Sequence, residues 1–422
     1  MILDKNEVQK RLGLLVILAT SMIESGRSIS GTVRIVKASA KGIGLKNVLI
    51  NATGKIVSIQ YIDPDNEVFI RNGIAKSVDA FDCDKMKQLE IVASKISSGD
   101  FTVEKGIEAI EQCKNISKPW WWVTGGLSVL GFCVALQVGG LFVTALIAGL
   151  LHFLVSISGR LLSRFNIPNL FSVALQCIVG GAIAFGAHYL GLISLTGAIV
   201  ALAVSWMLLV PQSLIISAVL DITNQQYVAG ITHTSLIVLI SSGILMGAVM
   251  ALSMTSVLQL PQDQKIILPT LSIPLGILFS VIGATANAMA NSGGKSLIIP
   301  AAIIGLVTAS INQILLHFFE MPSLWAASIT AIILGFFSEL LARRVVYPAP
   351  VLALMGIAGA LLPGLVVYNG VALQLFNEDG TKYFIQAALT CICLGIGVTF
   401  GFLLASYIKT RYNRIQSSFV QS

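Results

Sequence analysis

Charged residues are concentrated in the first 118 of the 422 residues of this chain. Residues 1–118 hold 17 of the 27 Lys and Arg and 14 of the 20 Asp and Glu, so the remaining 304 residues carry only 10 basic and 6 acidic side chains. Over the whole chain 11% of the residues are charged, against about 25% in soluble domains. We therefore predict a polytopic α-helical membrane protein with a small water-soluble domain ahead of its membrane region.

Ten apolar stretches after residue 118 are long enough to cross a bilayer, which takes about 20 helical residues. Five of them fall in residues 119–260 and five in residues 266–410, and residues 411–422 form a short tail. The predicted spans are Trp120–Gln137, Gly140–Ser158, Leu170–Leu190, Ser194–Leu220, His233–Leu258, Leu271–Ala290, Leu297–Phe319, Ser323–Leu341, Pro350–Phe376 and Lys382–Ile408.

One segment of the membrane region occurs twice. LLSRFNIPNLF (Leu161–Phe171) returns as LLHFFEMPSLW (Leu315–Trp325) at a constant offset of 154 residues. The same offset pairs the glycines at 139–140 with those at 293–294. A repeat of this length in a membrane protein is typical of two halves that face each other across a transport path.

Basic residues in the loops are distributed unevenly between the two sides of the membrane. The side that carries the first domain has ten Lys and Arg, whereas the other side has Lys265 and Lys382. The positive-inside rule therefore places the domain and both termini in the cytoplasm. Because five spans is an odd number, the second half enters from the opposite face, which predicts an inverted-topology repeat. The cytoplasmic basic residues are Lys114, Lys118, Arg160, Arg164, Lys295, Arg343, Arg344, Lys409, Arg411 and Arg414.

Residues 1–118 are predicted to form a small α+β domain in the cytoplasm. The apolar run at its start is too short to span a bilayer, and no signal peptide is expected. Thr53-Gly54 lies between two alternating stretches and predicts a β-hairpin. The charges of this domain fit a solvated surface, and regulation or support of the membrane region is the functional alternative. Helices are predicted at residues 4–24, 29–41, 85–96 and 102–114.

The chain has no pattern typical of an enzyme, a cofactor site or a nucleic-acid-binding protein. The basic residues of the first domain are balanced by acids and form no stripe interleaved with aromatic residues, which argues against nucleic acid. The six cysteines have neither disulfide nor zinc spacing and are expected to be reduced. SGGKS (Ser292–Ser296) lacks the earlier glycine and the preceding strand of a phosphate-binding loop. We therefore expect no cofactor, no metal and no enzyme activity.

Two predicted spans are longer than a bilayer requires, and each contains a proline. An offset of 152 residues pairs Pro211 with Pro363. A proline inside a helix removes a backbone donor and clashes with the preceding turn, so that the helix breaks. Broken helices bind charged groups in inverted-repeat transporters, and an ordinary packed kink is the alternative. The predicted substrate-binding residues are Pro211, Asp221, Asn224, Pro363, Tyr368 and Asn369.

Three ionisable residues are candidates for proton coupling. An ionised Asp within a span costs about 2.5–3.5 kcal/mol, so Asp221 needs a partner or a function, unless it lies in a cytoplasmic loop. His152 falls in the middle of its span, where it carries a proton or bridges helices as a neutral ring. Glu339 precedes Arg343 by four residues, a spacing that also favours an interfacial ion pair. Four uncharged polar residues either line the path or bridge helices: Asn287, Asn291, Asn312 and Gln313.

Three segments of the chain resemble the threonine/serine exporter family. LATSMIESGRSISGTVRIVKASAKGIG (Leu18–Gly44) is similar to the cytoplasmic domain of that family. LLVPQSLIISAVLDIT (Leu208–Thr223) and ALLPGLVVYNG (Ala360–Gly370) are similar to its two membrane modules, here fused in one chain. The likeness extends over nearly the whole sequence. It is weaker at one point, because Gln212 stands where the second copy has Gly364.

The resemblance implies a secondary transporter in the cell membrane that exports threonine and serine. It further implies that the proton gradient drives export, and we expect alternating access by movement of one repeat against the other. Related two-component members resemble dicarboxylate exporters, which makes a succinate-like substrate the first alternative. An intramembrane enzyme and a passive channel are the alternatives from other classes. The expected partners are the small-molecule substrate, protons and the lipid bilayer, and the sequence leaves open whether homo-oligomers form.

Overall fold

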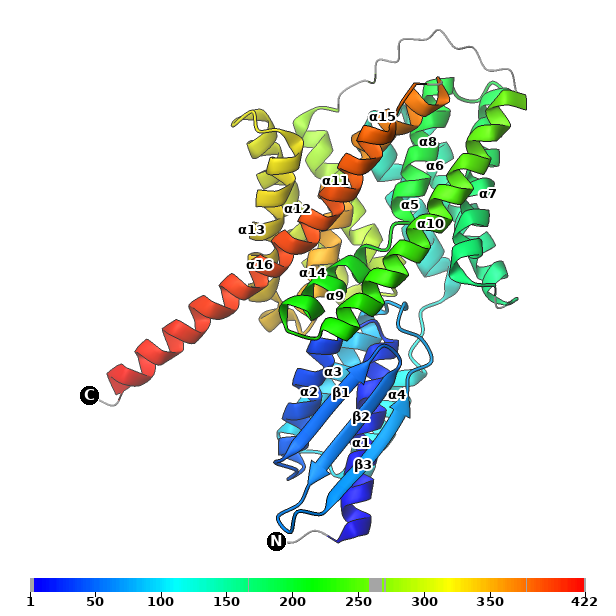
Figure 1. Cartoon of the computed structure of the whole chain (residues 1–422). Helices are drawn as coiled ribbons and strands as arrows, with labels where there is room; N and C mark the ends of the chain where they lie inside the picture. The colour runs from blue at the N-terminus through cyan, green and yellow to red at the C-terminus, as the bar shows by residue number, and fades with distance from the viewer. Residues whose placement is uncertain (1–3, 166, 258–267, 269–270, 377, 421–422) are drawn as a thin grey trace.

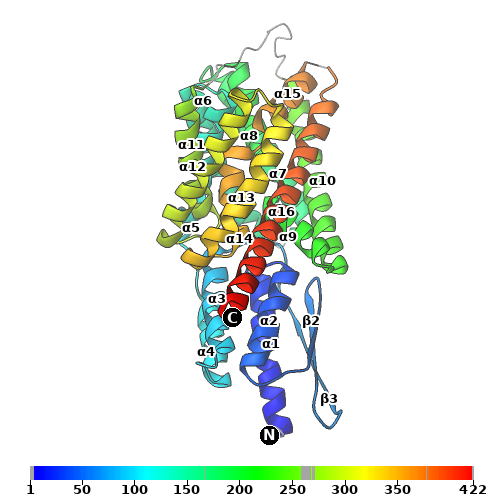
Figure 2. The same ribbon diagram turned by 90° about the vertical axis from the view of Figure 1, so that its left-hand side faces the viewer.

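The protein consists of a bundle of long helices with an N-terminal domain on one side of it (Figure 1). The computed structural model describes residues 4–165, 167–257, 268, 271–376 and 378–420. A quarter turn of the molecule shows the domain again below the bundle (Figure 2). The last helix extends past the bundle toward this same side, so both ends of the described chain lie on the side of the domain.

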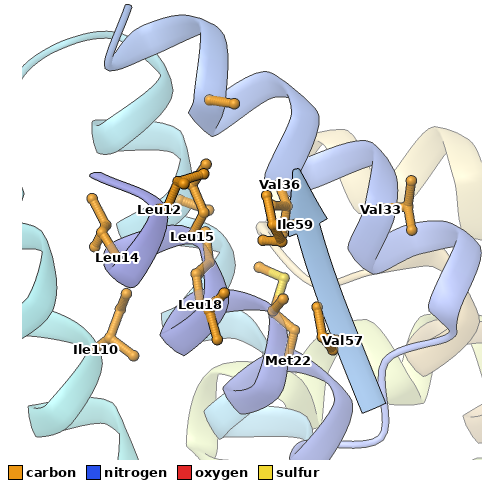
Figure 3. Close-up of a cluster of buried hydrophobic side chains, with 14 of the residues drawn as sticks. Leu12, Leu14, Leu15, Leu18, Met22, Val33, Val36, Val57, Ile59 and Ile110 are labelled. Atoms are coloured by element: carbon orange, nitrogen blue, oxygen red, sulfur yellow. The ribbon is translucent and has the colours of Figure 1, made fainter. Parts of the chain in front are cut away.

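The N-terminal domain packs helices against one face of a three-stranded antiparallel sheet. Its elements are α1 (Lys5–Glu24), α2 (Ile29–Gly42), β1 (Val48–Thr53), β2 (Ile56–Ile62), β3 (Val68–Ile74), α3 (Cys83–Ser97) and α4 (Val103–Lys114). The central strand β2 alternates, with Val57, Ile59 and Tyr61 buried. Side chains of α1, including Leu12 and Leu15, belong to the same apolar cluster as these strand residues (Figure 3). The predicted helices and the predicted hairpin at Thr53-Gly54 are confirmed.

The bundle confirms a polytopic helical protein. Among the described residues, nine helices are long and apolar enough to cross a membrane, and a helix pair bent by 51° makes a tenth span if counted as one. The helices are α5 (Trp120–Val138), α6 (Phe142–Ser163), α7 (Asn169–Tyr189), α8 (Leu195–Leu208), α9 (Gln212–Thr223), α10 (Tyr227–Val257), α11 (Ile273–Ala290), α12 (Lys295–His317), α13 (Ser323–Val345), α14 (Ala349–Gly356), the π-helix η1 (Ile357–Leu361), α15 (Gly364–Leu375) and α16 (Thr381–Val420).

The predicted spans correspond to these helices. The fourth span comprises α8 and α9, and the ninth comprises α14, η1 and α15. The boundary between the two halves near residues 260–266, which includes Lys265, lies outside the described residues. The same holds for the side chains of Arg411 and Arg414 in the predicted tail.

The duplicated segment has the same local structure in both copies. Pro168 immediately precedes α7, and Pro322 immediately precedes α13. Their backbone angles are nearly identical, with φ −54° and ψ 142° in the first copy and φ −55° and ψ 140° in the second. The fixed φ of proline suits the start of a helix. Each copy therefore forms the turn from one span to the next.

The turn after the first span has the same hydrogen bond in both halves, but the matching residues are displaced by one position from the pairing that the offset of 154 predicts. The N–H groups of Gly140 and Gly293 each donate to the carbonyl five residues earlier, at 2.8 Å in both turns. The left-handed residue before them is Gly139 (φ 103°) in one turn and Ser292 (φ 59°) in the other. Gly140 therefore corresponds to Gly293, whereas the offset of 154 paired it with Gly294, which instead caps α12.

Candidate functional site

Both predicted proline breaks are present, and they share one backbone geometry. Pro211 has φ −80° and ψ 73°, and Pro363 has φ −77° and ψ 49°. In each break the N–H after the proline donates to the carbonyl before it, at 2.9 Å from Gln212 and 2.8 Å from Gly364. These are the features of an inverse γ-turn. Neither Gln212 nor Gly364 has a positive φ, so the turn does not require glycine.

A cavity of about 400 Å³ lies at the first break. Its wall contains the end of α8, Pro211 and the first turn of α9, with α5, α7 and α10 from the same half. Helices α11, α14 and η1 of the other half complete the wall, and Phe81 of the N-terminal domain contributes to it. The cavity therefore lies between the two halves, toward the domain. Its polar lining residues are Asp79, Asn169, Gln212, Ser213, Asn287 and Asn291.

The ends of two helices line this cavity. In the described chain, the N–H of Ser213 in the first turn of α9 makes no hydrogen bond. The carbonyls of Leu208 and Leu209 at the end of α8 likewise accept none from the residues that the structure describes. The start of a helix carries partial positive charge and its end carries partial negative charge. One cavity thus offers donors to an anionic group and acceptors to a cationic group.

Amide side chains fix the wall contributed by the second half. Asn287 on α11 donates to the carbonyl of Leu354 on α14 at 3.1 Å, and Asn291 donates to the side-chain oxygen of Asn287 at 2.9 Å. Gln137 on α5 donates to the carbonyl of Gly359 in η1 at 3.0 Å, which links the two halves. Short π-helical segments within helices are frequent at functional sites. Asn287 therefore lines the cavity and bridges α11 to α14, whereas Asn291 lines the cavity and binds Asn287 of its own helix.

The charge at the cavity comes from the N-terminal domain. Asp79, an exposed residue between β3 and α3, is the one charged side chain among the described lining residues. Its carboxylate accepts a hydrogen bond from the side-chain amide of Asn169 at the start of α7. No Lys or Arg belongs to the described lining. The electrostatic environment of this cavity therefore favours a positively charged group near Asp79.

Asp221 does not line the cavity, because it lies in the last turn of α9. Its side chain is 0% exposed and accepts hydrogen bonds from the backbone N–H groups of Ser30, at 2.8 Å, and Ile29, at 3.2 Å. Both donors belong to the N-terminus of α2, which favours a negative charge. His233 on α10 places Nδ1 at 3.1 Å from the carboxylate. Asp221 is therefore a buried helix residue that binds the N-terminal domain, not a loop residue.

The other predicted substrate residues also lie outside the cavity wall. Asn224 caps the C-terminus of α9 through a 2.7 Å hydrogen bond to the carbonyl four residues earlier. Pro363, Tyr368 and Asn369 belong to the second break, at and beyond the start of α15. Tyr368 is 3% exposed and packs with α8 in one apolar cluster, where its hydroxyl has no hydrogen-bond partner among the described residues. Of the six predicted residues, Pro211 alone lines the cavity.

The remaining proton-coupling candidates have different surroundings. His152 is buried in α6, where Gly131 leaves room for its ring. Its Nε2 has no partner within the described part of the chain. Glu339 forms the predicted ion pair with Arg343, at 3.4 Å. Neither candidate lines the cavity.

Three residues with specific contacts were missed by sequence reasoning: Asp79, Asp84 and His233. Asp79 lines the cavity, His233 lies beside Asp221, and Asp84 joins α3 to the second half. Asp79 and its partner Asn169 are 90 residues apart in the chain, and Asp84 and its partner Gly294 are 210 residues apart. No local spacing marks such contacts, because the fold alone brings the partners together.

Comparison with known proteins identifies relatives of the whole chain. A family model described as "Putative threonine/serine exporter" matches residues 14–255, and one described as "Threonine/Serine exporter, ThrE" matches residues 276–408. A probable threonine/serine exporter of Mycobacterium tuberculosis is 24% identical, over 99% of this chain and 80% of that protein. A threonine/serine exporter of Corynebacterium glutamicum is 24% identical, over 96% of this chain and 84% of that protein. No solved structure matches.

Proposed function

Because this chain belongs to the threonine/serine exporter family, we propose that it is a secondary transporter that exports threonine and serine through the cavity at Pro211. Family membership and the apolar helices make it a multi-pass transporter of the cell membrane and not an enzyme. One observation carries the choice of site. The cavity lies between helices of both halves and is lined by the two helix ends, of α8 and α9, at the break of the fourth span.

The two helix ends suit a zwitterionic amino acid. The carboxylate of the substrate accepts hydrogen bonds from the start of α9, including the N–H of Ser213. The ammonium group binds near the carbonyls at the end of α8, Leu208 and Leu209, as cations do at unwound segments of transporters. Asp79 attracts the same ammonium group at the domain end of the cavity. The amides of Asn287 and Asn291 lie close enough to the cavity to contact a side-chain hydroxyl.

A dicarboxylate fits this cavity less well. It carries two negative charges and no positive one, so the second carboxylate needs a cationic partner. Among the described lining residues there is no Lys or Arg, and Asp79 repels an anion. The charge of the cavity therefore favours amino acids over succinate-like substrates.

We propose that the two halves form an inverted repeat that works by alternating access. Two contacts support opposite orientations. Asn169 in the first copy of the duplicated segment contacts the N-terminal domain. In the second half Gly294 contacts that domain at the start of α12, so the second copy at the far end of α12 lies on the opposite side. Figure 1 agrees, with α9 next to the domain and α15 at the other end of the bundle. With the basic loops inside, both termini are cytoplasmic.

Proton coupling is assigned in this proposal to Asp221 and His233. Asp221 is fully buried, and its carboxylate lies 3.1 Å from the ring of the likewise buried His233, so two ionisable groups meet at this place. A proton that enters this pair changes the charge that faces the N-terminus of α2. His152 and Glu339 are weaker candidates, because the Nε2 of His152 has no hydrogen-bond partner among the described residues and Glu339 is paired with Arg343.

Replacing Asp221 by Asn tests this assignment. The amide keeps the shape of the carboxylate but loses its charge, and a hydrogen bond to a charged group contributes about 1.5–3 kcal/mol. We expect Asp221→Asn to reduce gradient-driven export at least about tenfold while the protein remains in the membrane. Asp65→Asn, on the exposed turn between β2 and β3, is the matched control and should export normally. Wild-type export by Asp221→Asn would remove Asp221 from the coupling mechanism.

Efflux from preloaded cells tests the function itself. Cells that express the protein are loaded with threonine, serine or succinate, and the external concentration is followed with and without an uncoupler. We expect threonine and serine to accumulate outside against their gradients, the uncoupler to stop this, and succinate to remain inside. Export of succinate alone would favour the dicarboxylate alternative, and movement only down the gradient would indicate a channel.

A further inference from the structure

The N-terminal domain is attached to both halves of the membrane region by the same kind of contact. In the first attachment, the N-terminus of the domain helix α2 binds the membrane residue Asp221. In the second attachment the roles are exchanged, because the domain residue Asp84 binds the N-terminus of the membrane helix α12 through the N–H of Gly294, at 2.9 Å. Each contact pairs a carboxylate with the positive end of a helix.

Further groups strengthen the second attachment. The hydroxyl of Tyr347, directly after α13, donates to Asp84 at 2.7 Å, while Lys118 of the domain itself lies 2.6 Å from the same carboxylate. Lys87 on α3 donates to the hydroxyl of Ser296 on α12 at 2.9 Å. These contacts tie α3 of the domain to the start of α12 and the end of α13.

The two attachments differ in how much water reaches them. At the first, the side chains of Asp221 and His233 are 0% and 6% exposed, and Ala229 of α10 belongs to the core of the domain itself. At the second, Asp84 and Lys118 are 14% and 27% exposed. Water can replace polar contacts in the second attachment more easily than in the first, because its groups are already partly solvated.

Both attachments also have an apolar part. In the second attachment Cys83 and Met86 at the start of α3 are buried in the core of the second half, and Phe81 packs against that core. In the first attachment α10 continues the core of the domain, with Leu236 packed against it in addition to Ala229. The attachments therefore differ in their polar groups, which are buried at the first half and partly solvated at the second half.

We propose that the N-terminal domain moves with the first half and releases the second half at Asp84 in each transport cycle. This inference rests on the proposed function, because it requires the two halves to move against each other. With both attachments formed, the domain holds the domain-side ends of α9 and α12 at one fixed separation. Asp84 is then a positioning residue for transport, and the domain is a moving part of the transporter.

A reversible cross-link tests which attachment opens. Lys87→Cys with Ser296→Cys joins the domain to the second half, since the tips of the native side chains meet at 2.9 Å. Gly54→Cys with Thr232→Cys joins it to the first half, because a Cβ at Gly54 lies 3.4 Å from the Thr232 methyl group. Both full-length variants are treated with a short bis-methanethiosulfonate reagent, assayed for threonine export, and assayed again after reduction. The untreated parent and the treated parent, which keeps its native cysteines, are the controls.

The expected result is a loss of at least tenfold in export for the 87–296 link, with recovery on reduction, and retention of at least half the rate for the 54–232 link. Full export with the 87–296 link closed, or a block by the 54–232 link as strong, would overturn the proposal. Absence of export by the untreated parent would instead count against the proposed function. A measurement that needs no substrate separates the two. Spin labels at residues 87 and 296 should show two distance populations in liposomes, and a single short distance under all conditions would refute release.

Discussion

The two proline breaks have the same turn but different surroundings. At Pro211 the turn borders a cavity of about 400 Å³, with Gln212 and Ser213 in its wall. At Pro363 the neighbouring Gly364 is buried, with the Val138 side chain 2.5 Å from the place that a Cβ would occupy. The local sequence therefore forms the turn in both halves, whereas the relative position of the halves decides which turn is open. In alternating access the two surroundings are expected to exchange.

Filling the open break should have the largest effect. Ser213→Trp places an indole in the cavity, and overpacking costs of about 3 kcal/mol correspond to about a 100-fold loss. We expect threonine export to fall to the background of cells without the protein. Ser213→Ala is the control and should keep most of the activity, because the proposed contact with the substrate is made by the backbone N–H. An inactive Ser213→Ala with normal membrane levels would show that the hydroxyl matters instead.

Removing the breaks tests whether they are equivalent. Alanine allows the helix to continue where proline prevents it, a difference of about 3 kcal/mol in a helix interior. We expect Pro211→Ala and Pro363→Ala each to reduce the export rate by about tenfold. Pro300→Ala should export almost normally, since Pro300 lies within the continuous helix α12. A defect in Pro211→Ala alone would show that the second break is an ordinary packed kink.

A smaller effect is expected from the charge of Asp79 at the break that borders the cavity. Asp79 is exposed, and interactions of exposed charges contribute about 0.2–1 kcal/mol, so Asp79→Asn should raise the KM for threonine about two- to fivefold with little change in kcat. The double variant Asp79→Asn with Asn169→Asp exchanges the two contact partners and returns a carboxylate to the same place. Recovery of the wild-type KM in this double variant, measured from initial efflux rates, would distinguish the effect of the charge from a structural effect of the substitution.

The smallest effect should be that of pH on the second attachment. Burial raises the pKa of Asp84, but hydrogen bonds from Lys118, Tyr347 and the Gly294 N–H outweigh this and bring it below its ordinary value. A lowered pKa means that the contact is fully formed above about pH 4 and is lost only as the pH falls through the lowered value. The distances between spin labels at 87 and 296 should therefore not change between pH 8 and pH 5. A shift toward the longer distance at pH 5 would assign the release to another titrating group.

The sequence was sufficient for features that depend on composition and on short spacing. A bilayer requires long apolar helices, so a polytopic membrane region could be predicted from where the charges are. Proline fixes its own φ wherever it occurs, so Pro211 and Pro363 could be predicted as breaks. Arg343 binds Glu339 because i,i+4 positions are neighbours on a helix.

The tertiary structure decided everything that joins distant parts of the chain. Asp221 was a candidate by its cost in a membrane, but the α2 N–H groups that bind it are 191 and 192 residues away. Asn169 and Asp79 meet at the cavity from different domains, and only packing of the two halves creates the cavity itself. The physical reason is that backbone breaks are local, whereas an open cavity and a partner for a buried charge depend on how rigid helices are placed against one another.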